Sequence, residues 1–394
     1  VMAARVVWLV GTQQVAAAGV LGLTFTNKAA AELLQRIRSA LARLGGNAAD
    51  SADDALVATY HAFAGAMLRE FGLLIGCEPT EELMSAVRQR QLAYGVAVRA
   101  DLDPQAVLGS PGEVADRIVA LDSLLADSGV EVADLIRFDE ELLAGLRSGG
   151  PQQRTGERMR AAAAARRELA GLVSAFRAAK AEREVWDFAD YVRLGASLSS
   201  RHPDVGRQLR SRHQVVLLDE YQDTSVAQRG MLQALFGVGH PVTAVGDPCQ
   251  AIYGWRGASP HNLDGFPDHF PRSGGDPAAV YTLATNRRSG ADILSLANDV
   301  SADLRSVHRG VLQLRPDERR GSGNVTCALL PTVDEELSWL VGQLGEAARP
   351  WRDIAVLART NGGVADVVAA LRAAGIPVQV LGRQALLALP EVRW

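Results

Sequence analysis

Short apolar runs alternate with stretches of helical composition along much of the chain. Five runs rich in leucine and β-branched residues are predicted as buried strands, and they lie at 20–24, 56–59, 215–218, 242–245 and 280–283. Because each run is continuously apolar, the pattern favours a parallel sheet that helices cover on both faces. The first run leads directly into a helical stretch at Asn27 and Lys28, which predicts a strand–helix unit.

A long region between the second and third runs has a different composition. It is rich in Ala, Leu, Glu and Arg and holds few β-branched residues before Val185, which predicts helices. Within it, residues 101–146 carry 11 acidic and 2 basic side chains, whereas residues 151–184 carry 8 basic and 4 acidic ones. Solvated helix faces explain both stretches, although the arginines of the second stretch could instead line one helix face toward phosphates.

The alternation of strands and helices resumes near residue 278. Apolar runs predicted as strands lie at 324–330, 354–360 and 378–382, and helical stretches lie at 335–344 and 364–373. Segments rich in Gly, Pro and Arg at 271–277 and 315–323 are predicted as loops. The chain therefore divides into an α/β domain in two parts, a helical domain inserted into it, and part of a second α/β domain, with boundaries at 1–72, 205–277, 73–204 and 278–394.

The composition limits the class of protein. Of 394 residues 48% are hydrophobic and 22% charged, which is typical of a folded globular chain. The net charge of −4 excludes an overall basic coat for nucleic acid but not a local basic groove. Three distant cysteines argue against a disulfide or zinc framework and favour a reducing compartment. The chain shows no signal-peptide pattern and no run long enough to span a membrane, so we expect a cytoplasmic protein.

The run at 215–218 ends in two carboxylates, Asp219 and Glu220. Ligand sites of parallel sheets lie beyond the carboxyl ends of the strands. An Asp in that position can hold Mg²⁺ directly or through water, and a neighbouring Glu can orient or deprotonate the water that attacks a γ-phosphate. A surface acidic turn would give the same local pattern, so this segment alone does not decide between the two.

A second segment, VGDPCQAIYGWRGA at 245–258, also follows a predicted strand. It places Tyr253, Trp255 and Arg256 among glycines, and such a loop suits stacking on unpaired bases better than burial in a core. The alternative is that Trp255 packs the loop against the sheet.

Together these two segments resemble motifs of the superfamily 1 DNA helicases of the UvrD/Rep/PcrA type. DEYQDT resembles their Walker B motif, D-E-x-Q-D, and the second segment resembles their third motif. Further resemblances follow in the family's order: LGLTFTNKAAAEL at 21–33, ATYHAFAGAMLREFG at 58–72, LATNRRS at 283–289, IAVLARTN at 354–361 and AGIPVQVLG at 374–382. The resemblance covers almost the whole chain apart from the helical block, where it is only architectural. It implies two RecA-like P-loop NTPase motor domains with parallel sheets and a helical insertion in the first.

The resemblance implies a role for each matching residue. Asp219 would bind Mg²⁺, Glu220 would be the catalytic base, and Gln250 would sense the γ-phosphate of ATP. Arg288 would be an arginine finger, and Gln222 and Arg287 would join it in nucleotide binding. The residues expected to contact DNA are Phe25, Thr26, Asn27, Thr59, His61, Tyr253, Trp255 and Arg256. For His61 a hydrogen-bonded core position is an equal alternative.

The chain departs from the family pattern in two places. The phosphate-binding loop G-x-G-K-[ST] does not occur in residues 1–394, and because a helix like the one predicted at 1–10 normally follows that loop, we expect the loop upstream of Val1. Arg287 stands where the family commonly has a tyrosine that stacks on adenine, although a guanidinium can also stack on a base. The family's later motifs would lie beyond Trp394.

The sequence thus predicts a DNA-stimulated ATPase that uses ATP and Mg²⁺ to translocate 3′→5′ and to unwind DNA in repair or recombination. Its partners would be single-stranded and duplex DNA, in a bacterial cytoplasm and near the nucleoid, and the direction is implied by the resemblance alone. We expect the 394-residue chain by itself to lack ATPase activity.

Two alternatives stay open. The first is a motor subunit of an AdnAB/RecB-like helicase–nuclease, which the N-R-R-S variant of the fourth motif favours, with a nuclease or a second motor subunit as partner. The second, from another class, is a DNA-binding structural subunit with a decayed ATP site. The absent phosphate loop permits that reading, whereas Asp219, Glu220, Gln250 and Arg288 argue against it.

Overall fold

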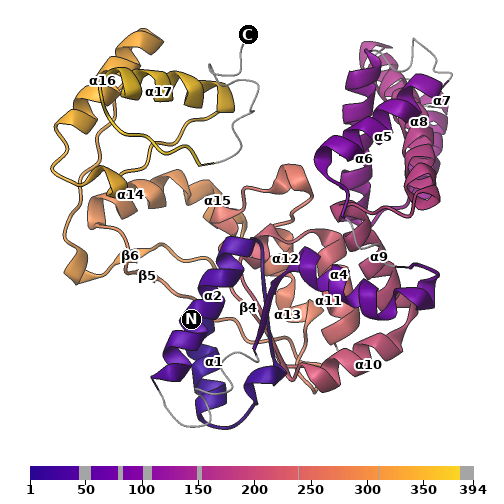
Figure 1. The fold of residues 1–394 in the computed structure, drawn as a ribbon, viewed down its shortest axis with the longest axis horizontal. Helices are drawn as coiled ribbons and strands as arrows, with labels where there is room; N and C mark the ends of the chain where they lie inside the picture. Colours follow the sequence, from indigo (N-terminus) through magenta and orange to yellow (C-terminus); the bar gives the residue numbers. More distant parts are fainter. Residues whose placement is uncertain are drawn as a thin grey trace. The chain divides into compact units, whose positions relative to one another are not determined.

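The computed structural model describes residues 1–43, 55–78, 83–100, 109–148, 153–237, 239–308 and 310–381. The chain groups into two compact units (Figure 1). We call residues 1–286 with 296–315 the sheet unit, and residues 287–295 with 316–394 the second unit. Each is described by itself.

A four-stranded parallel sheet forms the centre of the sheet unit. Its strand order is β2 (Leu56–Thr59), β1 (Val20–Thr24), β3 (Val215–Leu218) and β4 (Val242–Ala244). In the register, Leu23 pairs with Ala58 on one side and with Leu218 on the other, and Leu218 pairs with Ala244. The predicted parallel sheet is confirmed for these four strands, and all four carboxyl ends meet at one edge.

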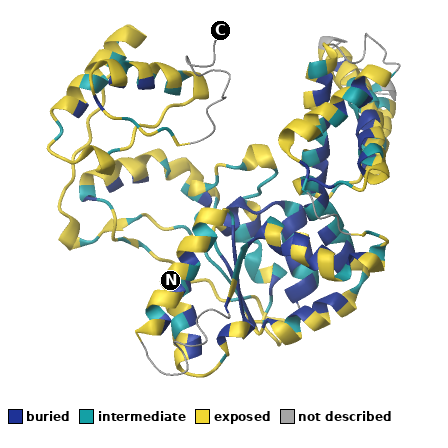
Figure 2. Cartoon of the chain, viewed as in Figure 1, coloured by how far each residue is buried: buried dark blue, intermediate teal, exposed yellow. Residues whose placement is uncertain are grey.

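Helices cover both faces of this sheet. Every residue of β1 and β3 is buried, because successive side chains of a strand point to opposite faces and each face has its own core. Leu21 and Leu218 pack with α4 (Tyr60–Phe71), α9 (Phe188–Arg201), α10 (Pro203–Arg212) and α11 (Val226–Phe236). Val20 and Leu217 pack on the other face with α1 (Met2–Gly11) and α2 (Asn27–Ala42). Figure 2 shows buried residues on the central strands and on the helices that cover them.

The helices between α4 and α9 bury a core of their own. They are α5 (Ala86–Arg99), α6 (Pro111–Ser128), α7 (Val132–Ser148) and α8 (Gln153–Glu182). Apolar side chains such as Val114, Ile118 and Phe176 form this core, and the helices pack side by side (Figure 1). The predicted helical character of this region is confirmed, while α9 packs with the core beside the sheet.

The acidic and basic stretches of the helical region pair with each other. Arg166 of α8 binds Asp139 of α7, and Arg177 of α8 binds Asp122 of α6 at 2.6 Å. Arg167 lies 3.6 Å from Glu140. For these arginines the structure favours ion pairing between helices over a free face toward phosphates.

The described residues of the second unit form no parallel sheet, so the structure confirms one of the two expected parallel-sheet domains. Helices α16 (Val333–Gly345) and α17 (Asn361–Ala373) confirm both predicted helices, and Leu344 and Leu371 contribute to a small core. The described residues of the predicted strands at 324–330, 354–360 and 378–382 form no ladder. A strand needs a paired neighbour and a core to bury its side chains, whereas Leu329 and Leu357 are 99% and 93% exposed.

The predicted strand at 280–283 is wrong for the same reason, because Tyr281 and Leu283 are exposed. Its place is taken by the short pair β5 (Thr285–Asn286) and β6 (Arg315–Pro316). The remaining short helices are α12 (His261–Asp264), α13 (Phe266–His269), α14 (Ala291–Val300) and α15 (Ala302–Val307). Among the described residues, one parallel-sheet domain is therefore evident.

Candidate functional site

The candidate site residues of the sheet unit follow the carboxyl ends of its four strands. Phe25, Thr26 and Asn27 follow β1, and Thr59 and His61 lie at the end of β2 and the start of α4. The DEYQDT segment (residues 219–224) follows β3, and the residues from Gly246 to Arg256 follow β4. Because the strands are parallel, these segments meet at the same edge of the sheet, where ligands of such sheets bind.

Asp219 is held by its backbone between two elements. Its N–H donates to the carbonyl of Leu23 at 2.8 Å, and the hydroxyl of Tyr60 donates to the carbonyl of Asp219 at 3.3 Å. Burial and the negative charge of Glu220 raise the pKa of Asp219. A cation bound there would relieve both effects.

This carboxylate pair fits the ligand preference of Mg²⁺. The described residues contain no group of three or more His, Cys, Asp or Glu side chains that could hold a metal by themselves. Mg²⁺ commonly uses one or two protein carboxylates and takes its other ligands from phosphates and water. Asp219 at the end of β3 matches that mode rather than a closed protein cage.

Glu220 adopts a left-handed backbone conformation with φ of 49°. Non-glycine residues rarely do so, and such strain is concentrated at functional sites. The amide of Gln222, which is 1% exposed, donates to the Glu220 carboxylate at 2.8 Å. The exposed Glu220 side chain is thus tied to a buried one.

Gln222 also joins the DEYQDT segment to the loop after β4. The N–H of Asp247 donates to Gln222 Oε1 at 3.1 Å, and Gln250 Nε2 donates to Asp247 Oδ2 at 2.8 Å. A Cβ at Gly246 would lie 2.6 Å from Gln222 Oε1, so this approach requires glycine. The predicted base and the predicted phosphate sensor therefore belong to one hydrogen-bonded network, in which Asp247 is a member that the sequence did not single out.

The far end of the same loop is anchored as well. Asn262, which is buried, donates through its side-chain amide to the Thr224 carbonyl at 2.9 Å and to the Ser225 carbonyl at 3.2 Å. The N–H of Ser259 donates to the Thr224 carbonyl at 3.0 Å. Sequence reasoning missed Asn262, because nothing in its local pattern marks a contact with a residue 38 positions away.

Three aromatic rings form a continuous surface, which we call the aromatic platform: Phe25, Tyr253 and Trp255. The rings of Phe25 and Tyr253 lie 4.5 Å apart between centroids, and those of Tyr253 and Trp255 lie 6.3 Å apart. The Arg256 guanidinium lies over the indole at 5.3 Å. Trp255 is 77% exposed, so the alternative in which it packs the loop against the sheet does not hold.

His61 lies beside a further aromatic residue, Phe188. The two rings make an edge-to-face contact with centroids 5.3 Å apart, and Phe188 is 55% exposed at the start of α9. Burial, and then the charge of Arg256, lower the pKa of His61 to about 4, so His61 is neutral at physiological pH. Phe188 was not predicted as a site residue. The sequence feature that could have indicated it is an aromatic residue directly after Asp187, which caps α9.

Thr26 and Thr59 each cap a helix at this edge. The Thr26 hydroxyl accepts from the N–H of Ala29 and starts α2, and the Thr59 hydroxyl accepts from the N–H of Ala62 and starts α4, both at 3.1 Å. Helix N-termini attract phosphate oxygens through free N–H groups and the helix dipole. Asn27 is the exposed first residue of α2.

Arg287 and Arg288 belong to the second unit. Both are exposed. Within that unit Arg287 lies 3.8 Å from Asp317, and its carbonyl accepts from Arg320 Nε at 2.6 Å. The expected nucleotide roles of the two arginines stay predictions.

Neither lysine of the chain serves a phosphate loop in the described residues. Lys28 is exposed on α2 and lies 4.0 Å from Glu32, and Lys180 is buried among aspartates.

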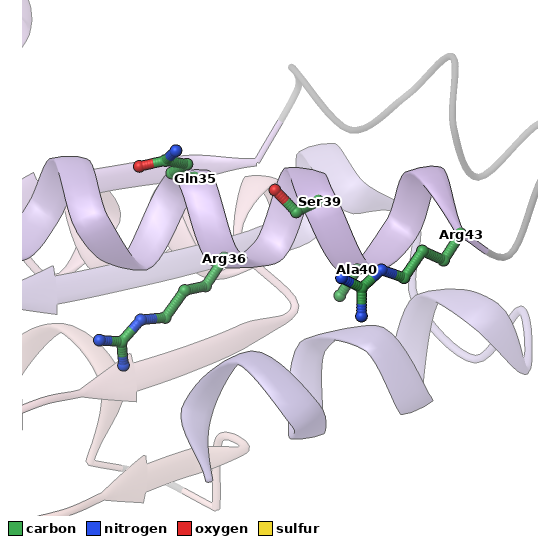
Figure 3. Close-up of a pocket in the computed structure, with 5 residues that line it drawn as sticks. All are labelled: Gln35, Arg36, Ser39, Ala40 and Arg43. Carbon is green, nitrogen blue, oxygen red and sulfur yellow. The ribbon is translucent and has the colours of Figure 1, made fainter.

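A surface pocket of about 310 Å³ lies along α2 and holds no residue of the DEYQDT segment or the loop after β4. Figure 3 shows that the residues lining this pocket come from α2 and the residue after it: Gln35, Arg36, Ser39, Ala40 and Arg43. The pocket is therefore not the candidate site.

Comparison with known proteins gives one family. The family profile described as UvrD/REP helicase N-terminal domain matches residues 1–271. The ATP-dependent DNA helicase UvrD2 of Mycobacterium tuberculosis is 31% identical over 98% of this chain and 53% of its own length. UvrD1 of the same organism is 28% identical over 100% and 47%, and PcrA of Leuconostoc citreum is 27% identical over 92% and 43%. The chain thus spans about half the length of these relatives.

None of the helices in the described part of the chain combines the length and the apolar character that a membrane span requires.

Proposed function

Because the chain belongs to the UvrD/REP helicase family, we propose that it carries the first motor domain of an ATP-dependent DNA translocase and helicase that moves 3′→5′. The observation that carries this proposal is the network from Glu220 through Gln222 and Asp247 to Gln250. The same loop continues into Tyr253 and Trp255 of the aromatic platform. One loop therefore connects the residues suited to phosphate chemistry with those suited to stacking bases.

In the proposed ATP site, Asp219 would hold Mg²⁺, which when bound would neutralise charge on the phosphates of ATP. Glu220 would orient the attacking water and accept its proton. Gln250, held by Asp247, would contact the γ-phosphate. Gln222 would hold the Glu220 carboxylate and the loop after β4 in fixed positions relative to each other. Arg287 and Arg288 would complete nucleotide binding, with Arg288 as the arginine finger.

In the proposed DNA site, the aromatic platform would stack on unpaired bases. Phe188 would extend this surface beside His61, which is neutral and so offers a ring without charge. The strand backbone would lie near Thr26, Asn27 and Thr59, where two helices begin. Arg256 would supply positive charge next to Trp255.

The proposed domain limits are those expected from the sequence, with residues 1–72 and 205–277 as the first motor domain, 73–204 as the inserted helical domain and 278–394 as part of the second. We place the protein in the bacterial cytoplasm, in DNA repair or recombination, with single-stranded and duplex DNA as partners. An AdnAB/RecB-like motor subunit with a nuclease or second motor as partner is the alternative within this class.

A candidate of another class is a DNA-binding subunit that does not hydrolyse ATP. The intact network around Glu220 argues against it. The two candidates differ in whether single-stranded DNA stimulates ATP hydrolysis by the full-length protein.

The test is Glu220→Gln in the full-length protein. Removing the carboxylate while keeping its shape is expected to lower DNA-stimulated kcat by about 100-fold or more without loss of nucleotide binding. Glu32→Gln, on the exposed face of α2, is the control and should keep wild-type turnover. Wild-type kcat in Glu220→Gln would refute the assigned base, and no hydrolysis by the wild type would favour the non-hydrolysing candidate.

A further inference from the structure

The last turn of α6 touches the loop that carries Trp255. Asp127 lies in that turn, and it faces Gly257 directly after the short 3₁₀ turn η5 (Gly254–Arg256). Gly257 has φ of 76°, and a Cβ there would lie 2.4 Å from the Cβ of Asp127. The backbone of the loop therefore approaches the helix as closely as glycine allows.

The carboxylate of Asp127 contacts both segments of the candidate site. The hydroxyls of Ser225 and Ser123 hydrogen-bond to it, and the charge of Arg256 acts on it. Ser225 directly follows the DEYQDT segment and caps α11 by accepting from the N–H of Gln228 at 3.2 Å. A single carboxylate from the helical region thus meets one residue after β3 and one after β4.

We propose that Asp127 is a positioning residue for the DNA-binding loop, because its side chain packs against Gly257 directly after η5 and its negative charge attracts Arg256. Arg256 in turn lies over the Trp255 ring, so the position of α6 sets the position of the exposed indole. This inference rests on the proposed function in that the loop binds single-stranded DNA. It adds a device by which the helical region governs that binding.

The groups that face Asp127 predict how this contact responds to pH. They are Ser123 on its own helix, Ser225 at the start of α11, and Arg256 on the loop. Arg256 also acts on His61 of α4, whose pKa is lowered to about 4. Burial raises the pKa of Asp127 to about 6, against the opposing effects of Ser225, Arg256 and Ser123. Among these groups, Asp127 is therefore the one that changes charge between pH ~5 and ~7.5.

Protonation of Asp127 removes its attraction for Arg256 and frees the loop. Single-strand affinity of the wild type is then expected to fall as the pH drops through about 6. Asp127→Asn has the same shape and can still bond to Ser225, but it carries no charge at any pH. It should bind single-stranded DNA about threefold to tenfold more weakly than the wild type near pH ~7.5, and its affinity should not follow that titration.

The experiment measures fluorescence anisotropy of a labelled oligothymidine with the full-length protein at fixed salt, from pH ~5 to ~7.5. Asp116→Asn, on the exposed side of the same helix and paired with Arg90, is the matched control and should behave as the wild type. Hydrogen exchange of residues 252–258 without DNA gives a second readout, and it should be faster in Asp127→Asn while the sheet stays protected. That readout shows whether the variant is folded.

Two results would overturn the proposal: wild-type affinity and pH dependence in Asp127→Asn, or unchanged exchange of the loop in that variant. A wild-type protein that does not bind the oligothymidine at any pH would instead refute the proposed function. The exchange measurement, which needs no DNA, keeps the two failures apart.

Discussion

Lys180 provides the sharpest test of how α6 and α8 are joined to the start of α9. Its ammonium lies 2.9 Å from Asp122 of α6, 2.9 Å from Asp187 and 2.7 Å from Asp190 at the start of α9. The side chains of all four residues are nearly inaccessible to solvent. Burial alone would lower the pKa of Lys180, but the three carboxylates outweigh it and raise that pKa above 10.5.

Replacing Lys180 by Met removes the charge and keeps much of the volume. Asp122 would retain Arg177 at 2.6 Å, and Asp190 would retain Arg193 at 3.1 Å. Asp187 would keep the amide of Gln89 at 2.8 Å and the N–H of Asp190 at 3.0 Å, but it would lose its cation. Removing one partner of a buried ion pair costs about 3–5 kcal/mol, and because two carboxylates keep an arginine we expect the lower end, about 3 kcal/mol.

The cost should depend on pH with a definite sign. Burial, and then the charge of Asp190, already raise the pKa of Asp187, and the loss of Lys180 would raise it further. The folded variant then binds a proton that the unfolded chain releases, so its stability falls as the pH rises from the unfolded value toward the folded pKa of Asp187. In the wild type the contribution of Lys180 itself is present below its unfolded pKa and is lost only as the pH rises through its raised folded pKa.

The assay is urea unfolding followed by circular dichroism at pH ~7.5 and ~5. The other lysine of the chain gives the control, because Lys28→Met removes the same charge at an exposed position and should change stability little. Lys180→Met with wild-type stability at pH ~7.5, or with the same cost at both pH values, would show that the charge of Lys180 does not stabilise the fold.

Two further predictions concern the loop after β4. Trp255→Ala should weaken single-strand binding by about 1–3 kcal/mol and leave the melting temperature unchanged, because the ring is 77% exposed; an unchanged Kd with a lower Tm would contradict it. Gly246→Ala should lower DNA-stimulated kcat of the full-length protein by about 100-fold, because its Cβ would meet Gln222 at 2.6 Å. Gly254→Ala, whose Cβ meets open space, is the control, and equal turnover in the two variants would show that the Gln222 contact does not matter.

The parts of the fold that the sequence predicts well are those fixed by local pattern. β1 and β3 are continuously apolar because both of their faces are buried, and the Asp219–Glu220 pair could be placed because it directly follows such a strand. The same pattern failed at 280–283 and 354–360, where apolar residues such as Leu357 are exposed. Periodicity identifies residues suited to a strand, but the presence of a paired neighbour is decided by the tertiary fold.

The parts of the site that the sequence did not predict are contacts between distant segments. Gln222 could be assigned only through a motif, whereas its bond to the N–H of Asp247 depends on β3 and β4 lying side by side. The role of Asp127 depends on the packing of α6 against η5, which no local pattern encodes. Likewise the charged stretches of the helical region could be counted, but their pairing, as between Arg177 and Asp122, needed the helix arrangement.

The anchoring of the loop after β4 suggests how the two halves of the site would communicate. The loop is bound to the DEYQDT segment at its start, through Asp247 and Gln222, and at its end, through Asn262 and Thr224. Tyr253 and Trp255 lie on the surface between these anchors. Among the described residues, the ring contact that joins them to the end of a strand is the one between Tyr253 and Phe25. A segment fixed at both ends moves with its anchors. If Glu220 exchanges its hydrogen bond with Gln222 for another partner, Gln222 would shift. That shift would move the aromatic platform rather than be absorbed by a flexible linker.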